Sequence, residues 1–365
     1  MNSQLFLGTR KGLFTLSRKE RGDDWKIART TFLGDQVPMF FPDPRDRSIY
    51  AALYHGHFGP KLHRSSDGGK SWTECAVPSF AATNADAAKS GPSVELIWSL
   101  EAARPTTPGT LWAGTVPGGL FQSANSGQSW QLVDSLWDNP KRQEWFGGGM
   151  DKPGIHSICV HPHHPDHVRV GVSCGGVWET RDAGRSWDCR ASGMIARFMP
   201  PDRQSDPNIQ DPHRLVQSPS NPDVLWAQHH NGIFRSTDGS QSWHEIQVPG
   251  ASSFGFAVVV HPRDPDTAWF VPALSDERRI PADSKVVVTR TRDGGKSFDV
   301  LTRGLPQEQA YHLVFRHSLD IDDSGQSLAF GSTTGSVWTS DDDGDSWHRL
   351  SADLPPIYCV RFAPW

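Results

Sequence analysis

A short polar turn that ends in an aromatic residue recurs along this chain of 365 residues. Clear copies are SSDGGKSW at 65–72, TRDAGRSW at 180–187 and STDGSQSW at 236–243. The six closing aromatics are Trp72, Trp130, Trp187, Trp243, Phe298 and Trp347, and a worn copy, TLSRKERGDDW, ends at Trp25. Successive copies lie 47 to 58 residues apart. A recurring interval of this length predicts an architecture built from repeated units.

Each copy of the turn closes a longer unit. In LWAGTVPGGLFQSANSGQSW at 111–130, an apolar run, a Gly-containing turn and an alternating run precede the polar turn. This pattern predicts antiparallel strands in a meander. A fourth strand lies upstream, such as IHSICVHP at 155–162, and leads into a Pro/Asp hairpin such as HPHHPDH at 161–167. Four strands per repeat are typical of a β-propeller blade.

The two ends of the sequence complement each other. QLFLGTRKGLFTL at 4–16 corresponds to the second and third strands of a blade, and PPIYCVRFAPW at 355–365 corresponds to a first strand. We expect the C-terminal strand to pair with the N-terminal blade and close a ring, which removes an exposed sheet edge. The prediction is therefore an all-β, seven-bladed β-propeller that forms a single domain over residues 1–365.

The repeated turn resembles the Asp-box, or bacterial neuraminidase repeat, whose pattern is S/T-x-D-x-G-x-T/S-W/F. The resemblance covers essentially the whole chain, although Asn125 replaces the Asp in one copy and Phe298 replaces the Trp in another. Similar turns occur in sialidases, xyloglucanases, sortilin-type receptors and photosystem II assembly factors, so the resemblance implies a fold more than an activity. In the predicted turn, the Asp accepts backbone N–H groups, the Gly allows a positive φ and the aromatic packs between sheets.

Composition narrows the class of protein. A net charge of -5 argues against nucleic acid and anionic membranes as partners. The N-terminus shows no secretion signal and no apolar run is long enough to span a membrane, so we expect a soluble, unexported protein. Five cysteines without a CxxC spacing fit the reducing cytoplasm and not a thiolate metal site.

Histidines gather in loops on one predicted face, called the upper face. It holds the turns between second and third strands and the loops that enter first strands. The histidines placed there are His55, His57, His156, His213, His229, His230 and His312. We expect them to converge on the mouth of the central channel. The basic residues Arg10, Lys61, Arg197, Arg214, Arg278 and Arg279 share this rim and would suit an anionic or polyhydroxylated ligand.

Two long loops enter first strands, at 139–158 and 193–215. Loops of this length in a compact fold are usually lids or binding loops. Trp145 and Phe198 lie on them and could stack on a sugar ring or simply pack the loops.

Carboxylates on the upper face suggest a hydrolase. Glycoside hydrolysis needs an acid and a base or nucleophile about 5–10 Å apart. The candidates are Glu95, Asp151, Asp211, Asp276 and Glu277. A true sialidase fits poorly, because Arg279-Ile280-Pro281 lies in the sixth blade, whereas the sialidase motif lies near the N-terminus.

The histidines suggest two further versions of an enzyme. His156, His213 and one of the adjacent His229 and His230 could hold a divalent metal, completed by Glu277 or Asp211. A histidine and Tyr311 could instead serve as base and acid in a lyase acting on a uronate. The predicted catalytic residues are His156, His213, Glu277 and Tyr311. The predicted substrate-binding residues are Arg279, Arg214, His55, His57, His312, Arg197 and Trp145, and the predicted metal ligands are His229 and His230.

A non-catalytic propeller is the alternative. The resemblance to photosystem II assembly factors implies a platform that binds protein partners. Loss of turnover without loss of folding, after alanine substitution at His156, His213 and Glu277, would distinguish a catalyst from a platform. The sequence leaves the substrate, the metal and the oligomeric state open.

Overall fold

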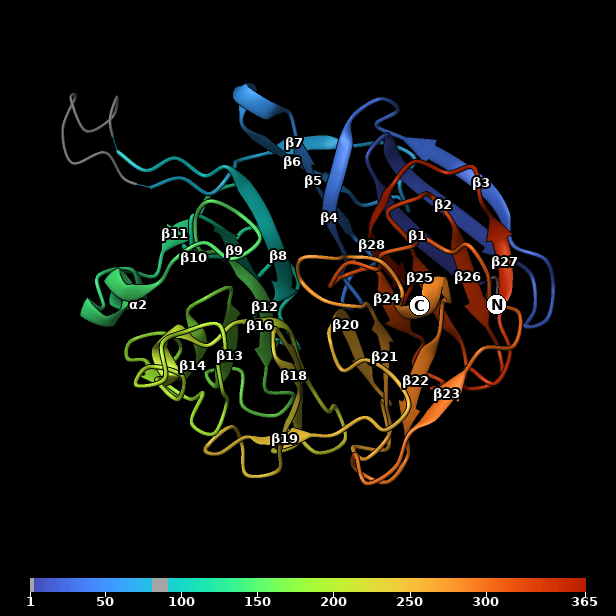
Figure 1. The fold of residues 1–365 in the computed structure, drawn as a ribbon. Coiled ribbons are helices and arrows are strands. Elements are labelled where there is room, and N and C mark those ends of the chain that lie inside the picture. The colour runs from blue at the N-terminus through green and yellow to red at the C-terminus, as the bar shows by residue number, and fades with distance from the viewer. Residues whose placement is uncertain (1–2, 81–90) are drawn as a thin grey trace. The chain divides into compact units, whose positions relative to one another are not determined.

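The computed structural model describes residues 3–80 and 91–365. It confirms an all-β, seven-bladed propeller, because the strands form seven antiparallel sheets of four strands each (Figure 1). Helix is almost absent from the described part of the chain, where the α-helix α2 spans only Asp134–Trp137. None of the described helices is long and apolar enough to cross a membrane.

The chain divides into two compact units. Unit 1 comprises Met1–Val37, Ala191–Asp206 and Pro212–Trp365, and unit 2 comprises Pro38–Arg190 and Pro207–Asp211. The single domain expected over residues 1–365 stays a prediction.

Unit 1 contains four of the sheets. Their strands, in spatial order, are β28 (Ile357–Phe362), β1 (Ser3–Thr9), β2 (Gly12–Arg18) and β3 (Lys26–Thr31); β16 (Pro212–Gln217), β17 (Leu225–His229), β18 (Gly232–Ser236) and β19 (His244–Ile246); β20 (Gly255–Val260), β21 (Ala268–Pro272), β22 (Val288–Thr291) and β23 (Asp299–Leu301); and β24 (Leu319–Ile321), β25 (Leu328–Gly331), β26 (Val337–Ser340) and β27 (His348–Ser351). The C-terminal β28 pairs with the N-terminal β1, with Leu7 opposite Val360. The predicted pairing of the two chain ends is therefore confirmed.

Unit 2 contains the other three sheets. Their strands are β4 (Gln36–Pro42), β5 (Ile49–Tyr54), β6 (Pro60–Ser65) and β7 (Thr73–Cys75); β8 (Leu96–Ala102), β9 (Leu111–Val116), β10 (Leu120–Ser123) and β11 (Gln131–Leu132); and β12 (Ile155–Val160), β13 (Val168–Val172), β14 (Gly176–Thr180) and β15 (Asp188–Cys189). Short 3-10 turns lie between some strands, at Gly56–Phe58, Pro140–Glu144 and Pro207–Ile209 in this unit and at Ala282–Ser284 in unit 1.

The repeated turn has the geometry predicted for it. In the copy at 180–187, Asp182 Oδ1 accepts the backbone N–H groups of Arg185 and Ser186 at 3.0 and 2.9 Å. The Thr180 hydroxyl donates to the same carboxylate at 2.8 Å and accepts the N–H of Gly184 at 2.9 Å. Gly184 has a φ of +89°, which favours glycine. The turn is thus a self-contained hydrogen-bonded loop.

The aromatic that closes this turn packs into the core. Trp187 is buried in one hydrophobic cluster with Trp178 of its own sheet and Trp112 of the β8–β11 sheet. Large aromatic side chains contribute most of the buried area in such a core. The repeat therefore builds the frame of the protein, as the sequence predicts.

Candidate functional site

Five aromatic rings come together in unit 1 from segments that are distant in sequence. They belong to Phe198, His213, His230, Phe254 and Phe256 and are called the His213 cluster below. The loop before β16 supplies the first ring, β16 the second, the turn after β17 the third, and β20 with its entering loop the last two. The grouping depends on loops that enter first strands, where the sequence predicted function.

His213 is the centre of the cluster. Its side chain is almost completely buried and stacks on Phe256, with ring centroids 4.4 Å apart and planes 13° apart. Nδ1 lies 2.6 Å from the carbonyl oxygen of Gly255, to which it donates. The neutral ring therefore carries its lone pair on Nε2. A larger residue at Gly255 would disturb this contact, since its Cβ would lie 3.0 Å from the Val271 carbonyl oxygen.

His230 and Phe198 extend the cluster outward. The His230 ring lies 5.5 Å from His213 and 4.7 Å from Phe198, tilted strongly against both. Phe198 is 40% exposed. The cluster thus continues from a buried imidazole to an aromatic ring that solvent can reach.

The adjacent His229 lies in different surroundings. It is completely buried, its ring meets Phe234 edge to face at 5.0 Å, and its Nδ1 accepts the N–H of Asn231 at 3.0 Å. Successive residues at the end of a strand point to opposite sides. Only His230 of the pair therefore adjoins His213.

Two arginines lie over Phe256, the ring on which His213 stacks. The guanidinium groups of Arg279 and Arg316 lie 5.4 and 5.9 Å from the Phe256 centroid. Arg316 Nε also donates to the carbonyl oxygen of His213 at 2.7 Å, and Arg279 forms an ion pair with Asp276. The two arginines therefore hold the cluster in place and also bring positive charge to it.

Glu277 is an exposed carboxylate that interacts electrostatically with His230 of the cluster. Hydrogen bonds from its own backbone N–H and from the Ser275 hydroxyl lower the pKa of Glu277, and the electrostatic effect of His230 lowers it further, against burial and the charge of Asp276. The group is ionised at neutral pH.

Asp320 on β24 was missed by sequence reasoning. Burial raises its pKa to about 6, against the opposing effects of Arg361, of the Phe362 N–H that donates to it at 2.8 Å, and of Arg214. A carboxyl with this pKa is a proton donor near neutral pH. The signal in the sequence was an aspartate inside the apolar strand Leu319–Ile321.

Other predicted residues of unit 1 lie outside the cluster's ring contacts. Arg197 pairs with Glu245 at 2.5 Å, which raises the pKa of Arg197. Tyr311 is 59% exposed, next to His312. The His312 ring meets Trp338 edge to face at 4.9 Å, and burial lowers the pKa of His312.

Residues predicted in unit 2 are held by local contacts. His156 is completely buried, with Nδ1 2.9 Å from the Ser157 hydroxyl and its ring edge to face with Trp98. Trp145 is 6% exposed, and its indole N–H donates to Asn208 Oδ1 at 3.1 Å. Trp145 therefore packs its loop instead of offering a free ring.

His55 and His57 lie at a short turn in the same unit, His55 just before it and His57 within it. His57 lies on the 3-10 turn Gly56–Phe58, with its ring 3.9 Å from the Phe58 ring. The predicted convergence of seven histidines on one channel mouth stays a prediction, because His55, His57 and His156 belong to unit 2 and the other four to unit 1.

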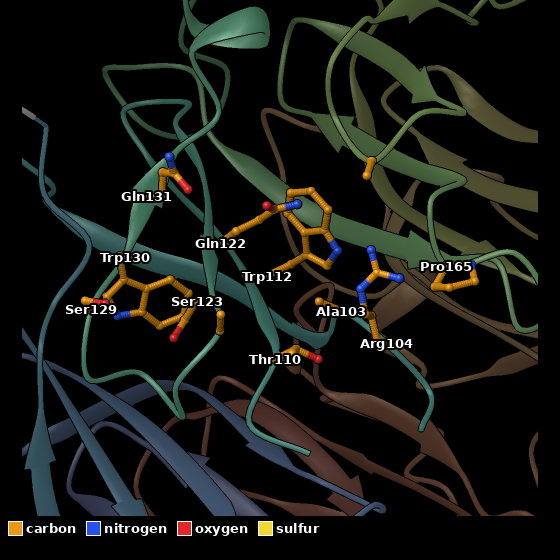
Figure 2. Close-up of a pocket in the computed structure, with 12 residues that line it drawn as sticks. Ala103, Arg104, Thr110, Trp112, Gln122, Ser123, Ser129, Trp130, Gln131 and Pro165 are labelled. Carbon is orange, nitrogen blue, oxygen red and sulfur yellow. The ribbon is translucent and has the colours of Figure 1, made fainter. Parts of the chain in front are cut away.

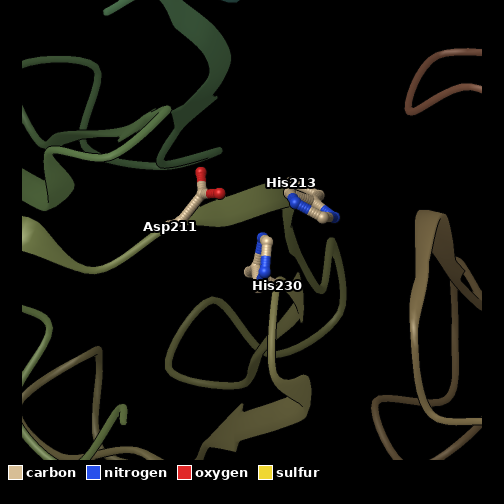
Figure 3. A group of neighbouring side chains, drawn as sticks. All are labelled: Asp211, His213 and His230. Carbon is tan, nitrogen blue, oxygen red and sulfur yellow. The ribbon is translucent and has the colours of Figure 1, made fainter. Parts of the chain in front are cut away.

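The metal prediction concerns the same histidines. Figure 3 shows the side chains of Asp211, His213 and His230. His213 and His230 belong to unit 1, whereas Asp211 belongs to unit 2 and accepts the N–H of Cys174 at 3.1 Å. A bound divalent ion therefore stays a prediction. Within unit 1, its ligands would be the imidazoles of His213 and His230.

Comparison with known proteins gives distant relatives. No protein-family profile matches the chain. An oligoxyloglucan-reducing end-specific xyloglucanase from Emericella nidulans is 24% identical over 293 residues, which cover 72% of this chain and 34% of the relative. The chain thus spans about a third of the length of this relative.

Solved structures share the fold. The GH74 enzyme of Niastella koreensis is similar with a TM-score of 0.64 at 16% identity, over 96% of this chain and 56% of that enzyme. YCF48 bound to a D1 peptide is similar with a TM-score of 0.52 at 13% identity, over 86% of this chain and 80% of the other. Identities this low establish similarity of fold and leave function to the site.

Proposed function

We propose that this chain is a glycoside hydrolase whose sugar substrate stacks against the His213 cluster. The observation that carries the proposal is a partly exposed aromatic ring, Phe198, that continues through the half-buried His230 to the buried His213, with the ionised Glu277 close enough to His230 to interact electrostatically. Sugar rings bind through their apolar faces on aromatic side chains, and a few polar groups then fix their orientation. Similarity to a xyloglucanase supports a carbohydrate as the substrate class.

We propose that two carboxyl groups of unit 1, Glu277 and Asp320, serve as base and acid, which requires them to lie within the roughly 5–10 Å that glycoside hydrolysis needs. Surroundings lower the pKa of Glu277 and raise that of Asp320, and opposed shifts of this kind are how one site provides both functions. Glu277 interacts electrostatically with His230, and Asp320 with Arg214, the residue after His213. We assign Glu277 the role of base or nucleophile and Asp320 that of proton donor.

Release of reducing ends from xyloglucan tests this assignment. Glu277→Gln and Asp320→Asn should each lower kcat by about 10²-fold or more, with much smaller effects on KM. Asp283→Asn is the matched control, because Asp283 is an exposed acid on the same connection between β21 and β22. Wild-type turnover in both variants would overturn the assignment.

The charge of the substrate is the finer part of the proposal. Arg279 and Arg316 bring two positive charges to the cluster, and Asp276 and Glu277 bring two negative ones, so the charges around the cluster nearly balance. We therefore propose a neutral sugar as the first substrate to test. The predicted anionic ligand is tested with a uronate-containing oligosaccharide, which should be cleaved more slowly.

A divalent ion is another finer form of the proposal. His213 Nε2 and a ring nitrogen of His230 would be its ligands. The purified protein should then contain metal by elemental analysis, and His230→Ala should lose it. Full activity in metal-free protein would remove the ion from the proposal.

A peptide-binding platform is the competing function. It is favoured by the fold shared with YCF48, whose solved structure contains a bound peptide. The absence of turnover on every carbohydrate tested, together with peptide binding that Phe198→Ala abolishes, would favour the platform over the enzyme.

A further inference from the structure

A recess lies in unit 2, at the end of the β8–β11 sheet that carries the repeated turn. Its volume is about 430 Å³, which is within the range of small-molecule sites. Figure 2 shows Trp112 and Trp130 on its walls, with Arg104 toward the neighbouring sheet. Pro165 and Ala183 of the β12–β15 sheet complete the lining.

The equivalent space in the β16–β19 sheet is filled by an arginine. Trp226 on β17 stands opposite Arg235 on β18. The indole N–H of Trp226 donates to the Pro265 carbonyl at 3.0 Å, and the Arg235 guanidinium lies 5.0 Å from the indole centroid. Arg235 also donates to the Gly294 carbonyl at 3.2 Å. Trp226 and Arg235 thereby bridge to the next sheet.

The β20–β23 sheet repeats this arrangement. Trp269 stands opposite Arg290, and both donate to the carbonyl oxygen of Asp343 in the next sheet at 2.8 Å. A tryptophan opposite an arginine is thus the device that joins two pairs of neighbouring sheets in unit 1.

The β8–β11 sheet keeps the tryptophan and lacks the arginine. Trp112 stands opposite Gln122, whose side chain is shorter than that of an arginine. Pro165 and Ala183 occupy the positions that correspond in the repeats to Pro265 and Gly294, and both line the recess. The recess is therefore the volume that an arginine occupies in the other two sheets.

The exchange also leaves a buried donor without a partner. Trp112 is 1% exposed, and its indole nitrogen has no hydrogen-bond partner among the described residues. The indole nitrogens of Trp25, Trp187, Trp338 and Trp347 share this lack. Trp112 alone among these five lines the recess, and because its nitrogen is covered by protein atoms, a ligand can bring it an acceptor only if neighbouring side chains move aside.

The polar groups of the recess select against charged ligands. Its one cation, Arg104, is already paired with Asp166 at 2.9 Å. No carboxylate lines the recess in the described part of the chain. Gln122, Gln131 and Ser129 add neutral groups that both donate and accept. Neutral donors and acceptors between two indoles suit a polyhydroxylated ring.

We propose that this recess is a second carbohydrate-binding site, which takes a neutral sugar unit between Trp112 and Trp130. The amides and hydroxyls on the walls bond to the sugar hydroxyls, and one of these accepts the Trp112 N–H after the side chains over that nitrogen move aside. The site is separate from the His213 cluster and does not depend on hydrolysis.

Fluorine NMR of protein labelled with 5-fluorotryptophan locates the binding. The Trp112 and Trp226 signals are assigned with Trp112→Phe and Trp226→Phe. Titration with cellobiose should shift the Trp112 signal and leave the Trp226 signal unchanged, because the Trp226 N–H is bonded within the protein. Agmatine and glucuronate, as cationic and anionic probes, should shift neither.

Gln122→Arg is the decisive variant. The new arginine should stack on Trp112 as Arg235 does on Trp226, fill the recess and weaken cellobiose binding at least about tenfold. Gln128→Arg, on the turn that follows β10 but outside the recess, is the matched control and should bind like the wild type.

Three results would overturn the proposal. They are unchanged cellobiose binding in Gln122→Arg, a shift of the Trp112 signal only with agmatine or glucuronate, and no shift with any probe. Because the readout is binding, an inactive enzyme that still shows the cellobiose shift would contradict only the proposed hydrolase.

Discussion

At the scale of single residues, unit 1 treats two carboxyl groups in opposite ways. Glu277 is exposed and accepts hydrogen bonds, which lower its pKa. Asp320 lies on β24, the first strand of the β24–β27 sheet, where burial outweighs Arg361 and raises its pKa to about 6. The two carboxyl groups therefore release their protons at different pH values.

The raised pKa of Asp320 predicts a specific pH dependence of stability. The folded protein holds the Asp320 proton more tightly than the unfolded chain, so the stabilisation from this group is complete below about pH 4 and is lost as pH rises through about 6. Asp320→Asn should therefore match the wild-type Tm near pH 4 and exceed it above pH 6. Calorimetry from pH 4 to 8 measures this, and a constant Tm difference would contradict it.

The tryptophans that close the repeated turns allow a second test by single substitution. Trp187→Ala should lower the free energy of unfolding by about 3–5 kcal/mol, because Trp187 lies in a core cluster and leaves a cavity. Trp130→Ala is the control, since Trp130 closes an equivalent turn but is only half-buried. Denaturant unfolding should show the smaller loss for Trp130, and equal losses would argue against the core packing of Trp187.

At the scale of elements, the repeated turn is a local hydrogen-bond network whose residues are close in sequence. Its carboxylate accepts donors three and four residues ahead, so the turn forms wherever the residues are present. The copy with Asn125 makes the same backbone contact, because Asn125 Oδ1 accepts the N–H of Ser129 at 2.9 Å. An amide and a carboxylate therefore both close the turn.

The carboxylate turns should contribute to acid stability. Hydrogen bonds from Ser186 lower the pKa of Asp182 to about 2. Stabilisation from this group is therefore present above about pH 4 and is lost as pH falls toward 2. Asp182→Asn should lower Tm at pH 7 and reduce its fall between pH 4 and 2.

Asn125→Asp provides the converse variant for the same experiment. It introduces a titrating group into the turn that lacks one and should make the acid dependence steeper. Identical pH profiles for the wild type, Asp182→Asn and Asn125→Asp would contradict this account of the turns.

At the scale of the whole molecule, each unit is stabilised by sheets whose strands follow one another in sequence, with one exception. In unit 1 the last strand, β28, pairs with the first, β1. This pairing joins residues more than three hundred positions apart, and it covers the edge of β1.

Removal of β28 should expose that edge. Deletion of residues 356–365 should cause aggregation or a large loss of Tm, because β1 would present unpaired backbone groups. A synthetic peptide of residues 356–365 added during refolding should restore monomeric protein in light scattering. A deletion variant that stays monomeric with wild-type Tm would show that the pairing contributes little.

The blades could be predicted from sequence because their determinants are local. Turn residues, alternating strands and closing aromatics recur in phase, and each acts within about eight residues. The two ends were matched for the same reason, since each showed only part of a blade. The sequence also allowed histidines and arginines to be assigned to loops of the upper face, but it did not show which of them meet.

Contacts between side chains were decided by the tertiary structure. His213 stacks on Phe256 and receives the Arg316 bond from 103 positions away, and such meetings depend on the paths of long loops. The pKa of Asp320 depends on burial, which local sequence does not reveal. The sequence by itself determined seven repeated sheets, because their hydrogen bonds and turns are local. The tertiary structure decided which rings and charges meet, because that depends on packing between segments that the sequence keeps apart.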